Sequence, residues 1–303
     1  MPFNKIEEIV GSRVIVLGRG GLGNQLFQLA YAHSLSNNHQ KAVSFHLINS
    51  YKNYNDVSNF NLACSHLGRV HSKLEFCIEI YLKYSRFDKL GLTRRILMIE
   101  ESADFEGEIN KASKIRLPLF PRLISGFWQD WRVIESVAGT FVPELKRYLK
   151  EIVPLPVSLD GEGLITVHVR RGDLLSSGNR RIYGVIDLSA YRDLLSDLRK
   201  LHPDLTVVTV TDSPEMIIGE GAGFEFGKIL GPEECTPWQV LKLMENSRIV
   251  VSANSTLSWW GSYLAMTSGA KVLIPDPWYA NFTAMASENK KHPKFETYQA
   301  KFS

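Results

Sequence analysis

The sequence predicts an α/β protein made of two Rossmann-like domains. Apolar β-branched runs alternate with helical patterns, and two of these runs pass directly into glycine- or serine-rich turns that open helices. A stretch rich in proline and glycine interrupts the alternation at residues 151–163 and reads as a linker. With 303 residues the chain is long enough for two domains, which we place at residues 1–150 and 151–303.

The first half is expected to form one parallel α/β unit. Its predicted strands are residues 13–17, 42–47 and 122–127, and its predicted helices are residues 24–36 and 74–84. Residues 48–66 are rich in Asn, Ser, Tyr and Asp and predict a long loop. Residues 131–149 have helical spacing, with a break expected at Pro143.

The second half alternates more regularly. We expect strands at residues 164–170, 205–211, 224–230, 248–251 and 271–275. The helices between them are predicted at residues 189–201, after Pro214, at 236–247 and at 256–267, with Ser189 as an N-cap. Strands that alternate with helices predict a parallel sheet.

Composition excludes several classes of protein. Apolar residues make up 44% of the chain and charged residues 22%, as in ordinary soluble enzymes. A net charge of +3, from 35 basic and 32 acidic residues, is not the strong positive charge that is typical of nucleic-acid-binding proteins. Three scattered cysteines form no zinc or disulfide pattern, which favours a reducing cytosol. Without a signal-peptide core or an apolar run of roughly 18 residues, a cytoplasmic location is expected.

The strand at residues 164–170 ends in the most informative segment, which contains His168, Arg170, Arg171 and Asp173. Two fixed cations at a strand end suit a diphosphate, although a solvated surface with a salt bridge is the alternative. Because side chains alternate along a strand, we expect Arg170 to be the main diphosphate contact. Arg171 either contacts the same ligand or anchors the loop, and Asp173 either touches substrate or orients an arginine.

Two strand-to-helix turns carry further candidate anion sites, because their loops can aim backbone N–H groups at a ligand. Their candidate residues are Gly20, Gly21, Gly23, Asn24 and Gln25 in the first turn, and Asn254, Ser255 and Thr256 in the second. The alternatives are glycine for close packing in the first turn and plain N-capping in the second. Trp259 and Trp260 favour helix-to-sheet packing over a sugar platform.

The first turn also matches the G-x-G-x-x-G dinucleotide pattern. Such a site needs an acidic residue at the end of the following strand, and this chain has none before Asp56. A nicotinamide enzyme would also leave the arginine pair unexplained, so that reading is disfavoured.

Three segments resemble the motifs of the bacterial α-1,2-fucosyltransferases, glycosyltransferase family 11. They are residues 20–25, 168–173 and 254–261, and residues 126–129 resemble a fourth, weaker motif. The resemblance implies a GT-B-like fold, with two Rossmann-like domains facing across a cleft. Residues 1–150 would be the acceptor side and residues 151–303 the GDP-sugar donor domain. It leaves open whether the last helix packs back on the N-terminal domain.

The activity implied by this resemblance is inverting, metal-independent transfer of L-fucose. The donor would be GDP-L-fucose and the acceptor the 2-hydroxyl of a terminal β-galactoside in an O-antigen or capsule precursor, with no cofactor. Arg170 would stabilise the charge that grows on the β-phosphate. Asp173, His168 or a carboxylate of the N-terminal domain could serve as the base. The turn at Asp212 would read the guanine base or the ribose.

Two other functions stay open: another nucleotide-sugar glycosyltransferase on the same scaffold, or a non-catalytic protein that binds a sugar nucleotide or a glycan. The histidines have no metal-ligand spacing, and no Asp-x-Asp motif is present to hold Mg²⁺. Lys290, Lys291 and Lys294 could attach the chain peripherally to anionic lipid at the cytosolic face of the inner membrane, or could form a solvated tail.

Overall fold

The computed structural model describes most of the chain. The described residues are 14–39, 43–52, 56–63, 67, 70, 72–84, 98–100, 122–156, 163–175, 177–219, 225–281 and 287–302. They divide into two compact units, Met1–Glu144 and Leu145–Ser303. The division falls inside one helix, α8 (Ala138–Ile152), somewhat earlier than the boundary expected after residue 150.

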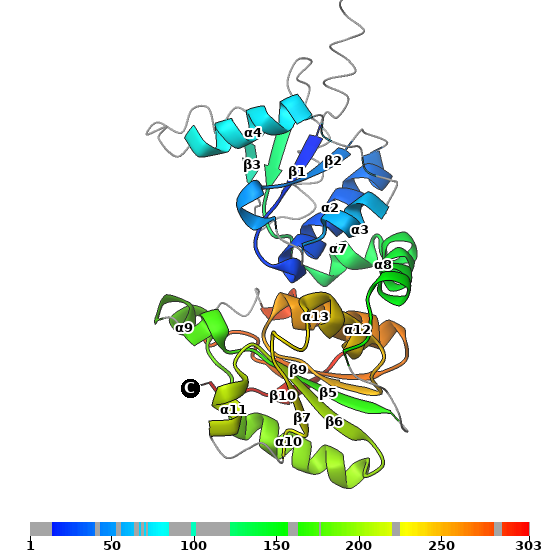
Figure 1. Ribbon diagram of the computed structural model, residues 1–303, viewed down its shortest axis with the longest axis vertical. Coiled ribbons are helices and arrows are strands. Elements are labelled where there is room, and N and C mark those ends of the chain that lie inside the picture. Colours follow the sequence, from blue (N-terminus) through cyan, green and yellow to red (C-terminus); the bar gives the residue numbers. More distant parts are fainter. Residues whose placement is uncertain are drawn as a thin grey trace, which may run out of the picture. The chain divides into compact units, whose positions relative to one another are not determined.

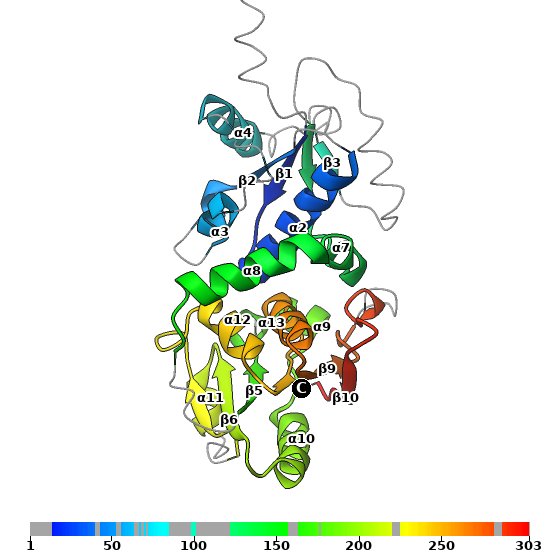
Figure 2. The ribbon, with the colours of Figure 1, turned by 90° about the vertical axis from the view of Figure 1, so that its right-hand side faces the viewer.

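Unit 1 contains a four-stranded parallel sheet in the order β2-β1-β4-β3. The strands are β1 (Val14–Gly18), β2 (Val43–Leu47), β3 (Met98–Glu100) and β4 (Arg122–Ser125). Helix α2 (Leu22–His39) and helix α4 (Ser72–Tyr84) lie on opposite faces of this sheet (Figures 1 and 2). Ile78 of α4 packs on Ile15, Leu17 and Leu123, which is the core on that face.

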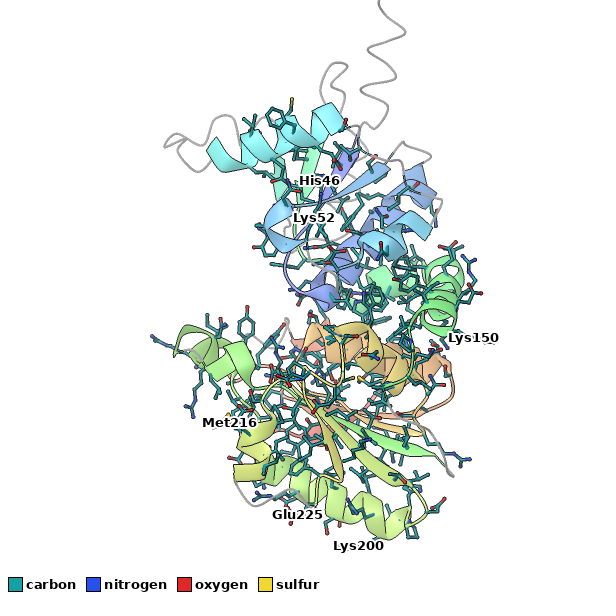
Figure 3. All side chains as sticks on the ribbon, viewed as in Figure 1. His46, Lys52, Lys150, Lys200, Met216 and Glu225 are labelled. Carbon is teal, nitrogen blue, oxygen red and sulfur yellow. The ribbon has the colours of Figure 1, made fainter. Side chains whose placement is uncertain are left out.

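One buried histidine ties α4 to the sheet. His46 of β2, labelled in Figure 3, points toward α4, and its Nε2 lies 3.0 Å from Glu79 Oε1. Its Nδ1 faces Glu75 Oε1 at 3.7 Å. Two turns of α4 are thereby fixed over the end of β2 by polar contacts.

Two predictions for unit 1 were wrong. Residues 48–66 are not one loop, because Asn49–Tyr51 form a 3-10 turn and Ser58–Ala63 form helix α3. The helical run from residue 131 breaks between α7 (Trp131–Glu135) and α8, and Pro143 lies inside α8. The break occurs where Ser136 Oγ bonds back to the Val133 carbonyl. Pro143 has no N–H to donate, yet the helix continues through it to Ile152.

Unit 2 contains a six-stranded parallel sheet in the order β10-β9-β8-β5-β6-β7. Its strands are β5 (Leu164–Val169), β6 (Thr206–Thr211), β7 (Lys228–Leu230), β8 (Ile249–Val251), β9 (Lys271–Asp276) and β10 (Glu296–Gln299). Strand order reverses between β5 and β8, as in doubly wound folds. The expected α/β class with two Rossmann-like units is confirmed.

Helices cover both faces of the second sheet. Figure 1 shows α10 (Leu188–Leu201) and α11 (Pro214–Gly219) on one face, and α12 (Pro237–Glu245) and α13 (Thr256–Thr267) on the other. Helix α9 (Ser177–Tyr183), which sequence patterns did not indicate, follows a 3-10 turn at Gly172–Leu175. The N-cap of α10 is Asp187, whose side chain accepts from the Ser189 N–H, so the expected cap at Ser189 was wrong by two residues.

Candidate active site

Three neighbouring strands bring the second-half candidates to one edge of the sheet. The register pairs Val167 of β5 with Val251 of β8, and Val169 of β5 with Thr211 of β6. The residues that follow these strands therefore lie side by side at their carboxyl ends. This is the point of strand-order reversal, where open α/β sheets bind ligands.

Arg170 and Asp212 form an ion pair at this edge. Arg170 Nη1 lies 2.9 Å from Asp212 Oδ2, with 32% of the arginine side chain and 21% of the aspartate side chain exposed. The other oxygen, Asp212 Oδ1, accepts the backbone N–H groups of Arg171 at 2.8 Å and Gly172 at 3.0 Å. Asp212 thus closes the turn after β5 and holds an accessible guanidinium. Asp212, which was expected to face a base or a ribose, makes these contacts within the protein, and its contact with a nucleotide stays a prediction.

Arg171 is buried whereas Arg170 is accessible, which agrees with the alternation of side chains expected at the end of the strand. Arg171 as a whole residue is 5% exposed. Hydrogen bonds from Ser189 lower the pKa of Asp187, and the charge of Arg171 lowers it further. Burial raises the pKa of Tyr191, and Arg171 opposes that rise. Of the two roles considered for Arg171, anchoring the loop is the one that this position supports.

His168 lies two residues before Arg170 and is 5% exposed. Burial, followed by the positive charge of Arg170, lowers the pKa of His168 to about 4. Within the described part of the chain, its Nδ1 has no hydrogen-bond partner. A buried ring that holds a proton so weakly is a poor general base near neutral pH. The structure therefore argues against His168 as the base, and the side chain of Asp173 lies outside the described residues.

The N-terminus of α13 faces the same edge from β8. Ser255 is its N-cap residue, yet the Ser255 side chain makes no capping hydrogen bond. The turn is instead held by Ser258, whose Oγ accepts the Ala253 N–H at 2.9 Å and lies 2.8 Å from Ser252 Oγ. The first N–H groups of a helix have no intrahelical acceptor, so this end of α13 can bind an anion at Ser255 and Thr256.

Asn254 combines a structural contact with an open acceptor. The side chain donates from Nδ2 to the carbonyl oxygens of Tyr183 at 3.1 Å and Gly184 at 3.2 Å. Its Oδ1 is buried and has no partner among the described residues. Asn254 therefore pins the end of α9 and leaves one acceptor atom at the carboxyl edge of the sheet. The neighbouring Trp259 and Trp260 are fully buried, as expected for packing residues.

The glycine turn of unit 1 follows β1 and opens α2. Gly20 has φ +80°, and a Cβ there would stand 2.6 Å from Asn24 Nδ2, whereas nothing lies within 4 Å of the same position at Gly21. Glycine is thus required for conformation at Gly20 only, and Gly21 leaves open space above the turn. Gly23 lies within the first turn of α2.

The polar side chains of this turn are engaged within the protein. Gln25, 1% exposed, donates to the Gly20 carbonyl at 2.7 Å and accepts from the Val57 N–H at 3.1 Å. Asn24 Oδ1 accepts from Gln129 Nε2 at 2.8 Å. These contacts give Gln25 a structural role in the loop, and its expected contact with the donor stays a prediction.

Sequence reasoning missed Gln28 and Ser258. Gln28, fully buried, accepts the Arg19 N–H at 2.8 Å and donates to the Gly126 carbonyl at 2.8 Å, which joins the glycine turn to the segment after β4. A polar residue on the buried face of an apolar helix is the signal that could have identified Gln28. The same signal applies to Ser258 in α13.

The C-terminal lysines and the potential metal ligands were two further features of the sequence. Lys290 is 3% exposed and Lys291 pairs with Asp276 and Glu288 at 3.0 Å each, whereas Lys294 is exposed, and attachment of these lysines to anionic lipid stays a prediction. Across the described residues, His, Cys, Asp and Glu nowhere gather in threes that could hold a metal ion. None of the helices in the described ranges is both long and apolar enough to cross a membrane.

Two bacterial proteins resemble this chain over most of its length, and a human protein resembles less than half of it. An Escherichia coli alpha-1,2-colitosyltransferase is 30% identical over 293 residues, which cover 88% of this chain and 92% of the relative. The Escherichia coli O-antigen biosynthesis glycosyltransferase WbnK is 24% identical over 288 residues, 86% of this chain and 93% of the relative. Human galactoside alpha-(1,2)-fucosyltransferase 1 is 30% identical over 127 residues, 41% of this chain and 33% of the relative.

The family model that matches is Glycosyl transferase family 11, over residues 13–297. This range includes the turn after β1 and the carboxyl edge of the second sheet with Arg170, Asn254 and Ser255. The chain belongs to glycosyl transferase family 11 and is a glycosyltransferase.

Proposed function

We propose that the protein transfers L-fucose from GDP-L-fucose to the 2-hydroxyl of a terminal β-galactoside, with inversion at the anomeric carbon. The observation that carries the proposal is the pairing, on adjacent strand ends, of the accessible Arg170 guanidinium with the uncapped N-terminus of α13. A fixed cation and free helix N–H groups are two established ways to bind phosphate oxygens.

Breaking the bond between the sugar and GDP leaves negative charge on the β-phosphate. In the proposed reaction Arg170 and the α13 N-terminus neutralise this charge, so no metal ion is required for the leaving group. The acceptor hydroxyl attacks the anomeric carbon, the glycosidic bond to the β-phosphate breaks, and the hydroxyl proton passes to a base. Asp173 and a carboxylate of unit 1 are the remaining candidates for that base.

The names of two relatives support the choice of sugar and linkage. The human relative is a galactoside alpha-(1,2)-fucosyltransferase and the first Escherichia coli relative an alpha-1,2-colitosyltransferase. The second Escherichia coli relative is named for O-antigen biosynthesis, and we propose a glycan of that kind as the acceptor. Contact with the membrane that carries such a precursor stays a prediction without an assigned surface.

Transfer of colitose is the second candidate, because the relative that matches 88% of this chain is named for it. Colitose is L-fucose without its 3-hydroxyl, so both sugars would present the same leaving group to Arg170. The two candidates are distinguished by measuring kcat/KM for GDP-L-fucose and for GDP-colitose in separate assays. The donor with the higher value is the substrate.

The test measures GDP release and product formation with EDTA present. A β-galactoside should be fucosylated, its 2-deoxy analogue should not, and NMR of the product should show an α-linkage. Binding of GDP, UDP and NAD⁺ is compared by thermal shift, where only GDP should raise the Tm. A Tm rise with UDP or NAD⁺ alone would overturn the donor, and product from the 2-deoxy analogue would overturn the linkage.

The variant Arg170→Ala tests whether the proposed site is responsible for the activity. We expect kcat/KM for the donor to fall by about 100-fold or more, as when one charge-stabilising donor is removed. Arg192→Ala is a matched control, because Arg192 is also 32% exposed and paired with a carboxylate, Glu225, at 3.0 Å. Equal activity of Arg170→Ala and Arg192→Ala would exclude the proposed site.

A further inference from the structure

We infer that Asp212 is a positioning residue that holds Arg170 for the donor diphosphate, and that it does not read the nucleobase. This inference rests on the proposed function. It concerns a carboxylate on β6 whose two oxygens make different contacts, one with the backbone turn after β5 and one with the Arg170 guanidinium.

The first contact fixes the turn. Asp212 Oδ1 accepts from two successive N–H groups, those of Arg171 and Gly172, at 2.8 and 3.0 Å. A Cβ added at Gly172 would collide with Asp212 Oδ2, so this approach requires glycine at position 172. A carboxylate that accepts two backbone N–H groups sets the path of the chain immediately after Arg170.

The second contact orients the charge. Arg170 Nη1 lies 2.9 Å from Asp212 Oδ2, which engages one corner of the guanidinium. A guanidinium carries five N–H donors in a fixed plane, so a carboxylate at one of them sets the direction in which the others point. Because 32% of the arginine side chain is exposed, the pair is accessible to a ligand.

Because of these contacts, the Asp212 carboxylate has little remaining capacity to accept hydrogen bonds from a guanine base. A guanine base would donate N–H groups to both carboxylate oxygens, yet Oδ1 already accepts two backbone N–H groups and Oδ2 is buried beside Arg170. Binding of a base by Asp212 would therefore require the turn after β5 to open. The geometry assigns Asp212 to the phosphate end of the nucleotide, where it acts through Arg170.

The experiment compares GDP with guanosine, which carries the base and ribose but no phosphate. Asp212→Asn keeps an oxygen for the two backbone N–H groups and removes the charge that holds Arg170. If Asp212 positions Arg170, the Kd for GDP should rise about tenfold or more in isothermal titration, while the Kd for guanosine should stay within about twofold. Asp193→Asn, which removes an exposed pair with Lys301 at 3.1 Å, is the matched control.

A double-mutant cycle shows whether Asp212 acts through Arg170. In an Arg170→Ala background, Asp212→Asn should have little further effect on the Kd for GDP or on donor KM. Asp212→Glu, which retains the charge on a longer arm, should restore part of the GDP affinity lost in Asp212→Asn.

Three results would overturn the inference. Equal losses for guanosine and GDP would assign Asp212 to the base, and an unchanged Kd for GDP would remove it from the site. Additive effects of Asp212→Asn and Arg170→Ala would show that Asp212 acts independently. Failure of the wild-type protein to bind GDP would instead refute the proposed function, and the inference with it.

Discussion

Burial of the His168 ring makes the stability of this protein depend on pH. The pKa of His168 is about 4 in the folded protein, below its ordinary value of 6.5, because of desolvation and the nearby Arg170 charge. The unfolded chain therefore takes up the proton first as the pH falls. The stability that the neutral ring contributes above about pH 6.5 is lost progressively down to about pH 4, by about 3 kcal/mol.

His168→Asn checks this prediction, because asparagine does not titrate in this range. Free energies of unfolding from urea titrations at pH 7, 6, 5 and 4 should fall less steeply for the variant than for the wild-type protein. Parallel curves for the two proteins would mean that the folded and unfolded chains protonate His168 alike.

Two adjacent glycines of the turn after β1, Gly20 and Gly21, should differ in how well they tolerate alanine. Gly20 has a positive φ and no room for a Cβ, so Gly20→Ala should lower the free energy of unfolding by about 1–2 kcal/mol. Gly21 is exposed and open, so Gly21→Ala should leave stability within about 0.5 kcal/mol. Thermal melts measure both, and equal losses would contradict the geometry of the turn.

At the scale of elements, α9 depends on a residue from another part of the fold. Asn254 donates to the carbonyls of Tyr183, the last residue of α9, and of Gly184 after it, and Asn281 donates to the Arg181 carbonyl at 3.1 Å. The exposed Arg180 and Arg181 make α9 a substrate for trypsin once its end loosens.

Asn254→Ala should therefore accelerate tryptic cleavage within α9 by about tenfold, since a buried pair of hydrogen bonds is worth at least about 1 kcal/mol. Asn246→Ala is the control, because Asn246 makes a comparable 2.8 Å bond to the Lys242 carbonyl at the exposed end of α12. Mass spectrometry of the fragments identifies the cleavage site. The same rate for both variants would show that Asn254 does not hold α9.

At the scale of the whole molecule, the second half of α8 belongs to unit 2. The Tyr148 ring lies 5.0 Å from the Trp238 ring of α12, and Lys146 Nζ donates to Ser268 Oγ at 2.6 Å. Lys242 of α12 bonds back to the carbonyl oxygens of Lys150 and Val153. A fragment that begins at residue 151 loses the helix that these contacts hold.

We therefore expect residues 138–303 to give a more stable fragment than residues 151–303, by about 2 kcal/mol or more, because Trp238 loses its aromatic neighbour and apolar cover. Circular dichroism melts of the two fragments compare them directly. Equal Tm values for the two fragments would contradict this prediction and would support a domain boundary after residue 150, as the linker composition suggests.

The sequence alone determined the alternation of elements and the chemistry of the motifs. Periodicity is local, so the strands β1, β5, β6 and β8 and the helix α13 were predicted within one or two residues of their bounds. The proposal that Arg170 contacts phosphate rests on its guanidinium and on its place at a strand end, both of which the sequence shows.

Tertiary structure decided the partners of the polar side chains. Asp212 lies 41 residues from Arg171 in the chain, Asn254 lies 71 from Tyr183, and Gln25 lies 32 from Val57. Each of these side chains looks like a ligand contact in the sequence, because its short-range neighbours leave it without a partner. Only strand register and helix packing bring the partner into range, since buried polar groups are satisfied by whatever the fold places beside them.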